Sequence, residues 1–508
     1  MAKKVDFREA TLRQLYENYG LTTADLEWEP TYVSKDEVSP PERRTRLPVK
    51  DWSKFEDPFK LFFEDYVRVQ AEKETVFHDA IRLAERFGEA RRINPRWVAG
   101  MKLYYPAVAQ SEAEAHRGHL GLSRHSPSPA LAMASFYQLL DELRHAQNDV
   151  HAMRYWVRYL DELKNWAQLY QNFWAMQVFR SLFEDMATPS DPFELVFHTN
   201  VALEMGYTNL LFVAAPTAGA ANGDRVFAQL QMSTQSDETR HIALGQATLR
   251  ALLEQENRDE LLPTLQYWFD KWTWRHHRVF GVTGIFLDYF AENKTLSYKE
   301  AFKKYFIEGY IQGLLEDFEP LGLKPPRFLD DIIKEAENYQ SHQVWKLAFQ
   351  YNYLNFFETF PPTEKDKAWL REKYPNWDQV VGWYWEQVEH GDPGIVQGLP
   401  LICNLCQFPI VYNPNDPDHP TNGSFHLRTT RYNGRTYYFC SDGCQYIFEH
   451  EPEKYAHAKT LTELVIEGRA PADVEKLREY MGLEPGWGGN LFEKPIWKEW
   501  LASQGREG

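Results

Sequence analysis

Two copies of one short motif constrain this chain more than any other feature of its sequence. They are Asp-Glu-Leu-Arg-His at 141–145 and Asp-Glu-Thr-Arg-His at 237–241. A three-residue step on a helix returns to the same face, so each copy directs one carboxylate and one imidazole to a common point. A glutamate precedes each copy at a similar distance: Glu112 and Glu204. Four such helices can bring four carboxylates and two imidazoles together inside a bundle, so we predict a ferritin-like helical core.

The chemistry of these residues predicts a pair of iron ions. Carboxylates are hard oxygen donors that can bridge two ions, and imidazole suits iron while leaving coordination positions open. A single Glu-x-x-His is more often a solvated helix face, but both copies lie near apolar sequence, at 130–134 and 210–215, where unpaired charge is costly. His116, four residues after Glu112, is a rival ligand that would break the symmetry. The predicted iron ligands are Glu112, Glu142, His145, Glu204, Glu238 and His241.

Composition limits the classes of protein to which the chain can belong. It has 508 residues with a formal charge of −17, which disfavours nonspecific binding to nucleic acid or to anionic lipid. We find no apolar run long enough for a membrane span and no signal-type segment at the start, so we expect a cytoplasmic protein. We divide the chain into an N-terminal arm at 1–60, a di-iron helical domain at 61–395 and a C-terminal region at 396–508.

Local signals place some element boundaries. Ser190-Asp191-Pro192 is typical of a helix cap followed by a first-turn proline, and we expect it to open the helix that carries Glu204. The helix of the second motif is expected to run from near Arg225 to about Gln255. The arm contains prolines and tryptophans, which favour docking against the body or a second subunit over a disordered tail.

All four cysteines fall in the C-terminal region, as Cys403-x-x-Cys406 and Cys440-x-x-x-Cys444. Short strand-like runs, 410–412 and 436–439, frame them on either side of a loop rich in Pro, Asn and Asp. Two close pairs of thiolates predict a closed structural zinc site of the zinc-ribbon or treble-clef type, and four unrelated buried cysteines are the alternative. The fold prediction is therefore mainly α, with a small C-terminal α+β zinc-binding region.

Helical spacing also names neighbours of the predicted iron ligands. Val108 lies four residues before Glu112, Thr208 four after Glu204, and Phe212 one further turn along. They predict an apolar pocket with one hydroxyl, although Thr208 is equally well explained by a hydrogen bond to its own helix. Side chains within the two motifs could orient imidazoles from neighbouring helices as supporting residues: Asp141, Arg144, Asp237 and Arg240.

The chain resembles the large (alpha) hydroxylase subunit of the bacterial multicomponent monooxygenases, in particular phenol hydroxylases and toluene monooxygenases. The resemblance extends over nearly the whole chain and includes the cysteine-bearing region. It is carried by these stretches: Glu112 to Gly118, Asp141 to His145, Phe183 to Asp185, Thr208 to Val213, Gln235 to His241, Phe439 to Asp442 and His450 to Tyr455.

The resemblance implies roles for individual residues. It implies the same six iron ligands as the spacing argument. It further implies that oxygen or proton handling and a gated pore involve Thr208, Asn209 and Gln235. The substrate pocket that it implies is lined by Val108, Phe183, Leu203 and Phe212.

The resemblance also implies an activity and partners. The chain would be the oxygenase component of a di-iron monooxygenase that hydroxylates aromatic compounds such as phenol, benzene or toluene. Since no nicotinamide, flavin or ferredoxin motif occurs here, electrons must come from a separate reductase. The resemblance implies that this reductase is NADH-dependent and carries FAD and a 2Fe–2S cluster. The expected partners also include a cofactorless regulatory protein and smaller beta and gamma subunits in an α2β2γ2 assembly.

Other functions remain open at this point. One is an alkene or alkane monooxygenase of the same family. Another is a radical generator of the ribonucleotide-reductase type, which would need a tyrosine beside the metals; Tyr137 and Tyr207 are near in sequence. A third is a ferritin-like iron store, which would hold many more than two irons per chain.

Overall fold

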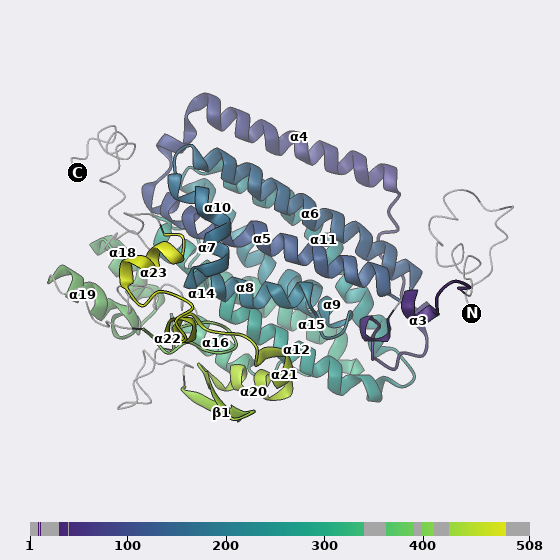
Figure 1. The fold of residues 1–508 in the computed structure, drawn as a ribbon. Helices are drawn as coiled ribbons and strands as arrows, with labels where there is room; N and C mark the ends of the chain where they lie inside the picture. The colour runs from purple at the N-terminus through teal and green to yellow at the C-terminus, as the bar shows by residue number, and fades with distance from the viewer. Residues whose placement is uncertain are drawn as a thin grey trace.

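The computed structural model describes residues 9, 11, 30–38, 40–339, 362–390, 399–410 and 426–483. Helices make up most of these residues, and the sheet that they contain is one two-stranded hairpin near the C-terminal end (Figure 1). The prediction of a mainly helical chain with a small C-terminal α+β region is confirmed. Within the described ranges, no helix is long and apolar enough to cross a membrane.

Four long helical segments form the core that carries the repeated motif. Helices α5 (Pro95–His125) and α6 (Pro129–Val157) pack along each other, and α11 (Arg225–Leu253) packs against α6. Helix α4 (Phe63–Phe87) is not one of these four; it contacts α6 and α11 and lies at the edge of the bundle (Figure 1). The fourth segment is a succession of helical stretches: α9 (Glu194–Val196), η5 (Phe197–Tyr207), η6 (Leu210–Ala214) and α10 (Ala215–Ala221).

The sequence encodes the start of three of these helices. Asn94, Ser128 and Asp224 each accept a hydrogen bond from a first-turn backbone amide, the arrangement that stabilises a helix N-terminus. A proline follows Asn94 and Ser128 at the first helical position, where its missing N–H costs nothing. The helix of the second motif was predicted to span about 225 to 255, and α11 ends two residues earlier, at Leu253.

A glycine lets the fourth segment approach α11 closely. A Cβ atom at Gly245 would lie 2.7 Å from the Cβ of Asn200 and 3.2 Å from its backbone carbon. Real Cβ atoms do not come this close, so only glycine permits the observed contact. The close packing brings η5, and Glu204 on it, against the face of α11 that carries His241.

The segment η5 is π-helical, with hydrogen bonds from each amide to the carbonyl five residues earlier. Such wide turns are found frequently at functional sites. The hydroxyl of Thr208 also bonds to the carbonyl of Leu203, five residues before it, at 3.2 Å. The wider turn brings residues five apart closer to one face than they would be in an α-helix.

Helices beyond the core pack around it. Helix α12 (Arg258–Phe280) runs along η5 and α8 (Trp174–Ala187) contacts α5. The other α-helices are short: α3 (Lys35–Val38), α7 (Trp166–Asn172), α13 (Thr283–Ile285), α14 (Tyr298–Phe302), α15 (Gly313–Phe318), α16 (Leu329–Glu337), α18 (Glu364–Lys373) and α19 (Trp383–Glu389). The remaining 3-10 and π stretches are η1 (Pro41–Arg43), η2 (Trp52–Lys54), η3 (Glu89–Arg92), η4 (Asp161–Asn165), η7 (Phe286–Phe290), η8 (Lys303–Gln312), η9 (Glu319–Leu321) and η11 (Asp378–Gly382).

The C-terminal region packs on α12 at the side of the body away from α4 (Figure 1). It contains the antiparallel strands β1 (Arg428–Tyr432) and β2 (Arg435–Phe439), followed by α20 (Asp442–His450), α21 (Pro452–Tyr455), α22 (Leu461–Ile466) and α23 (Val474–Tyr480). The fully buried ammonium of Lys271 on α12 contacts Glu194 Oε1 at 2.6 Å and Glu451 Oε2 at 2.5 Å. This cation links the start of the Glu204 segment to the C-terminal region.

Two local predictions need correction. The helix expected to open at Ser190-Asp191-Pro192 begins at Glu194, and Asp191 instead caps a turn by accepting from the amide of Phe193 at 2.9 Å. The expected strand at 436–439 lies within β2, but the loop expected before it contains a strand of its own, because Arg428–Tyr432 pairs with β2. Of the strand expected at 410–412, Ile410 directly follows an isolated β-bridge between Ile402 and Pro409, and residues 411 and 412 lie outside the described residues.

The described part of the N-terminal arm lies against the body. The backbone amide of Arg46 donates to Asp191 at 2.6 Å and that of Asp51 donates to Gln255 at 3.0 Å. The rings of Trp52 and Phe193 lie 4.6 Å apart. The predicted boundary between the helical domain and the C-terminal region, near 395, falls outside the described residues.

Candidate metal centre

The structure brings together the six side chains that the repeated motif and its two upstream glutamates predict. Two overlapping groups have ligand atoms within 4.8 Å of one another: Glu112 with Glu142 and His145, and Glu142 with Glu204 and His241. Glu238 completes the cluster, with carboxylate oxygens 3.8 Å from His145 Nδ1 and 3.1 Å from His241 Nδ1. All six come from the four core segments.

The distances divide the six groups into two outer pairs and two central carboxylates. Glu112 lies 3.7 Å from His145 Nδ1, and Glu204 lies 3.2 Å from His241 Nδ1. Glu142 lies near both imidazoles, at 3.4 Å from His145 Nδ1 and 3.6 Å from His241 Nδ1, as Glu238 does. Two cations would each have one outer glutamate and one histidine, with Glu142 and Glu238 shared between them.

The donor set fits two iron ions. Four carboxylates and two imidazoles are the hard and intermediate donors that iron accepts, and carboxylates buried this deeply need positive charge near them. His145 Nδ1 is buried and has no hydrogen-bond partner among the described residues, although its ring faces three carboxylates. A ring nitrogen in this position is suited to binding a metal ion.

The two motif copies hold each other's imidazole. Asp237 Oδ2 lies 3.2 Å from His145 Nε2, and Asp141 Oδ2 lies 3.1 Å from His241 Nε2. An ionised carboxylate only accepts hydrogen bonds, so each Nε2 carries the proton and each Nδ1 keeps its lone pair for a metal. Arg144 and Arg240 both bind Asp237, and Arg240 also binds Asp141.

Electrostatics agree with this assignment. Burial acts to raise the pKa of Asp237, but the hydrogen bond with His145 and the charges of Arg144, His145 and Arg240 hold it well below its usual range. The aspartate is therefore ionised and orients the imidazole. Burial raises the pKa of Glu112 to about 7 and that of Glu204 well above its usual range, so both carboxylates need a partner cation to remain charged at neutral pH.

Beyond the motif's own aspartates and arginines, sequence reasoning missed further side chains that support this cluster. From α4, Tyr66 Oη and Gln70 Nε2 donate to Asp141 Oδ1 at 2.8 Å each, and Lys73 Nζ lies 2.5 Å from Asp237. Residues 66, 70 and 73 recur at helical spacing, so a search for a polar, buried helix face could have found them.

Two amides beside the glutamates were also missed. Gln138 Nε2 donates to Glu142 at 3.0 Å and to Glu204 at 2.8 Å. Asn200 Nδ2 donates to Gln138 at 2.7 Å and to the carbonyl of His241 at 3.0 Å. Each amide lies four residues before a glutamate of the cluster, and that spacing was a usable signal.

An apolar pocket opens on the cluster. Its wall includes Glu112, Glu142, Glu204 and Glu238, so the carboxylates form its polar end. The pocket residues named from the sequence all line it: Val108, Phe183, Leu203, Thr208 and Phe212. Further aromatic side chains from α8, α12 and η7 complete the wall: Phe179, Phe280 and Phe286.

The other residues singled out in the sequence occupy defined positions. Gln235 Nε2 donates to Asn209 Oδ1 at 3.2 Å, so the structure pairs these two side chains. His116 Nδ1 lies 2.8 Å from the carbonyl of Leu139, which leaves the rival ligand outside the cluster. The hydroxyls of Tyr137 and Tyr207 donate to the carbonyls of Leu61 and Thr273 at 3.3 Å and 3.4 Å.

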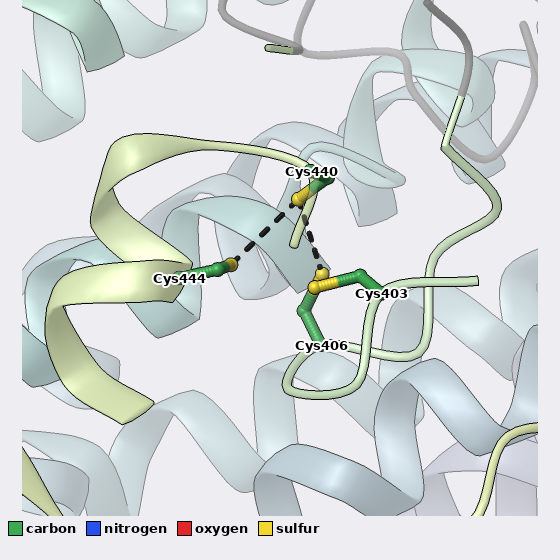
Figure 2. A group of neighbouring side chains, drawn as sticks. All are labelled: Cys403, Cys406, Cys440 and Cys444. Atoms are coloured by element: carbon green, nitrogen blue, oxygen red, sulfur yellow. Dashed lines mark hydrogen bonds between the residues drawn. The ribbon is translucent and has the colours of Figure 1, made fainter. Parts of the chain in front are cut away.

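The four cysteines form a second, separate cluster (Figure 2). Cys403 and Cys406 come from one loop, Cys440 follows β2, and Cys444 lies in the first turn of α20. Cys440 Sγ lies 3.5 Å from Cys406 Sγ and 3.7 Å from Cys444 Sγ, and all four are buried and free of disulfides. Zinc–sulfur bonds of about 2.3 Å in a tetrahedron place sulfurs about 3.8 Å apart, so the spacing fits one zinc ion.

The fold and the first cluster together define a class: helical-bundle proteins with two metals bridged by carboxylates. Comparison with known proteins specifies it. Residues 28–256 match the family model for methane, phenol and alkene hydroxylases, and residues 419–459 match the model of the YHS domain.

Individual relatives cover nearly the whole chain. The oxygenase component of phenol 2-monooxygenase from Pseudomonas sp. strain CF600 is 34% identical, over 97% of this chain and 95% of its own. The alpha subunit of the oxygenase component of an alkene monooxygenase from Xanthobacter autotrophicus is 28% identical, over 93% and 97%. The crystal structure of xenon-pressurised phenol hydroxylase from Pseudomonas sp. OX1 superposes with a TM-score of 0.87 at 30% identity, covering 97% of this chain and 100% of that one.

The chain therefore belongs to the methane, phenol and alkene hydroxylase family. It is the oxygenase component of a multicomponent di-iron monooxygenase, and the resemblance noted from its sequence is confirmed. The family supports an iron centre, and its relatives belong to multicomponent systems, which implies further subunits and a reductase.

Proposed function

We propose that this chain hydroxylates a small aromatic ring, with phenol as the first candidate substrate. The observation that carries the proposal is the apolar pocket that ends on the four carboxylates of the cluster. A substrate held there is shielded from water by aromatic and aliphatic side chains and faces the metals directly. Two relatives described as phenol hydroxylases, by sequence and by structure, support the choice of substrate.

The iron pair is assigned to Glu112, Glu142, His145, Glu204, Glu238 and His241. When reduced by electrons from a partner, such a pair activates O2 for insertion of one oxygen atom into the ring. Glu142 and Glu238 would be the ligands shared by the two ions, since each lies near both imidazoles. Asp141 and Asp237, with their arginines, keep the imidazoles in the orientation that the ions need.

The remaining assigned residues handle the substrate and protons. Val108, Phe183, Leu203 and Phe212 shape the pocket around the ring. Asn209 and Gln235, which are hydrogen-bonded to each other, are assigned with Thr208 to proton transfer and to gating of access. The hydroxyl of Thr208 lines the pocket while donating to its own helix, so it can still accept a hydrogen bond there.

We propose the remaining organisation as follows. Residues 1–60 are an arm, 61–395 the di-iron domain and 396–508 a region that folds around one structural zinc ion. The working assembly is α2β2γ2, with a cofactorless regulatory protein and an NADH-dependent reductase that carries FAD and a 2Fe–2S cluster. The cytoplasm is the proposed compartment, because a tetrathiolate site and an NADH-dependent partner both suit reducing conditions.

The test is a turnover assay on the complete system. The chain is purified with its smaller subunits and supplied with the reductase, the regulatory protein, NADH and ¹⁸O2. Phenol, benzene, toluene and propene are offered separately, and products are analysed by mass spectrometry. We expect ring-hydroxylated products that carry one ¹⁸O atom. Efficient epoxidation of propene without ring hydroxylation would contradict the proposal and favour an alkene oxygenase.

A further inference from the structure

One hydroxyl in the pocket wall has no hydrogen-bond partner. Thr199 is 1% exposed, lines the pocket together with Glu112 and Glu204, and its Oγ1 is buried. None of the described residues forms a hydrogen bond with that oxygen. A buried hydroxyl without a partner is unfavourable, and a valine would fill the same space without that penalty.

The other uncharged polar groups of the pocket are already paired. Ser111 Oγ donates to the carbonyl of Ala107 at 2.7 Å, and Thr208 Oγ1 donates to that of Leu203 at 3.2 Å. Tyr104 Oη accepts from Gln231 Nε2 at 2.5 Å. Thr199 thus carries the hydroxyl of this wall that has no hydrogen-bond partner among the described residues.

The helix geometry places this hydroxyl beside the metal cluster. Thr199 and Glu204 are five residues apart in η5, which is slightly more than one turn of a π-helix. Both side chains therefore lie toward the same side of the segment, and both line the same cavity. A ring bound in the cavity against the carboxylates would therefore also lie near Thr199.

We propose that the Thr199 hydroxyl hydrogen-bonds the hydroxyl group of a phenolic substrate and sets a preference for phenols over unsubstituted or methyl-substituted rings. This inference rests on the proposed function and adds a residue that selects among aromatic substrates. A hydroxyl can both donate and accept, so it pairs with a phenolic O–H in either direction. Benzene and toluene would leave it unpaired, and a site built to bind a hydroxyl discriminates against ligands that lack one.

The test compares three variants of the assembled enzyme with wild type. Thr199→Val removes the hydroxyl at nearly constant volume, and Thr199→Ser keeps it. Thr248→Val is the matched control, because Thr248 is equally buried, donates to the carbonyl of Leu244 at 2.8 Å and lies outside the pocket wall. Two quantities are measured: the ratio of kcat/KM for phenol to that for benzene, and the Kd of phenol for resting enzyme without reductase, by equilibrium dialysis.

Thr199→Val should lower the phenol-to-benzene ratio by roughly tenfold and raise the Kd of phenol by a similar factor, as expected for the loss of one buried hydrogen bond. The loss should fall on KM more than on kcat. Thr199→Ser should remain within about threefold of wild type, and Thr248→Val should leave both quantities unchanged. The melting temperature of each variant shows whether it is folded. If Thr199→Val does not fold, the test is the Kd of phenol for Thr199→Ser, which keeps the hydroxyl and should bind phenol nearly as tightly as wild type.

The outcomes separate this inference from the proposed function. If wild type hydroxylates phenol and benzene but Thr199→Val keeps the wild-type ratio and Kd, the inference is wrong and the proposed function stands. If wild type hydroxylates neither ring, the proposed function fails. The dialysis measurement still decides the inference in that case, because an unchanged Kd of phenol in Thr199→Val overturns it.

Discussion

The carboxylate–histidine cluster and the cysteine cluster use opposite ways of building a metal site. Ligands of the first come from four helical segments and span residues 112 to 241, whereas each pair of cysteines lies within one short stretch. The first borders an apolar pocket, and the second is a group of four buried sulfurs. A reaction needs open coordination positions and a cavity, and a structural site needs neither.

The side chains and segments that support the two clusters also differ: several helices support the first, and only neighbouring segments of the C-terminal region support the second. Around the carboxylate cluster, Tyr66, Gln70, Gln138 and Asn200 satisfy lone pairs that the metals would not use. Their hydrogen bonds fix the ligand geometry from several helices. The cysteine cluster depends on its own loop, the hairpin and the first turn of α20. We therefore expect substitutions in the carboxylate–histidine cluster to abolish activity, and substitutions in the cysteine cluster to disrupt folding of the C-terminal region.

The largest effect is expected from Glu142, which lies near both imidazoles. Glu142→Ala should reduce bound iron from about two per chain to less than one and abolish hydroxylation, because both ions lose a shared ligand. Glu204→Ala, which removes an outer ligand, should retain about one iron. Iron analysis by mass spectrometry and single-turnover product yield are the measurements.

The control for these variants is Glu114→Ala. Glu114 is on the same helix as Glu112 but pairs with Arg117 at 2.6 Å. Its loss should leave iron content and turnover as in wild type. Equal iron loss in Glu114→Ala and Glu142→Ala would show that the ligand set is wrong.

The second prediction tests whether the cysteine cluster is structural. Cys440→Ser should lower bound zinc to less than about half an ion per chain and destabilise the C-terminal region, because zinc binding contributes directly to folding. Iron per folded chain should not change. Zinc analysis and limited proteolysis followed by mass spectrometry measure both effects, and full zinc occupancy in the variant would contradict the assignment.

The third prediction concerns orientation of the imidazoles. Asp237→Asn keeps the shape of the side chain but removes the charge that holds the proton on His145 Nε2. Iron affinity should fall by roughly 10–100-fold, the range observed when such supporting residues are changed. Competition with a chelator measures the affinity. An Asp237→Asn enzyme with wild-type affinity would show that the crosswise arrangement of aspartates does not support the metals.

The smallest effect is expected in the pocket. Phe212→Ala enlarges the cavity next to Glu204 without touching a ligand. Iron content should stay at wild type while the ratio of ring positions hydroxylated in toluene changes, since orientation decides which carbon meets the oxidant. Val150→Ala, at a position on α6 that is 40% exposed, is the control. An unchanged product ratio in Phe212→Ala would place the ring elsewhere.

The sequence predicted the parts of this molecule that repeat or lie close together in the chain. The repeated Glu-x-x-His and the two cysteine pairs are short motifs with fixed spacing. The extent of α11 follows from the helical periodicity of its sequence. Val108 and Thr208 could be placed in the pocket because helical spacing links them to Glu112 and Glu204. The family resemblance added Phe183 and Leu203, which no spacing argument reached.

The remaining features depend on contacts between distant segments. The spacing of residues 66, 70 and 73 indicates a polar face on α4, but not that this face reaches Asp141 and Asp237, since that contact depends on how the helix packs. Strand β1 was missed because Arg-Thr-Thr-Arg-Tyr is polar and follows a loop-forming stretch, and its pairing with β2 makes it a strand. The π-helical turns, which align Thr199 with Glu204, also could not be read from helical periodicity.

The central claim is that one chain holds two chemically distinct metal sites, and X-ray absorption at the iron and zinc edges of the purified protein tests it most directly. We expect about two irons with only oxygen and nitrogen neighbours and an iron–iron distance of about 3–4 Å, as in carboxylate-bridged pairs. We also expect about one zinc with four sulfurs at about 2.3 Å. Sulfur bound to iron, or zinc surrounded by oxygen and nitrogen, would contradict the claim.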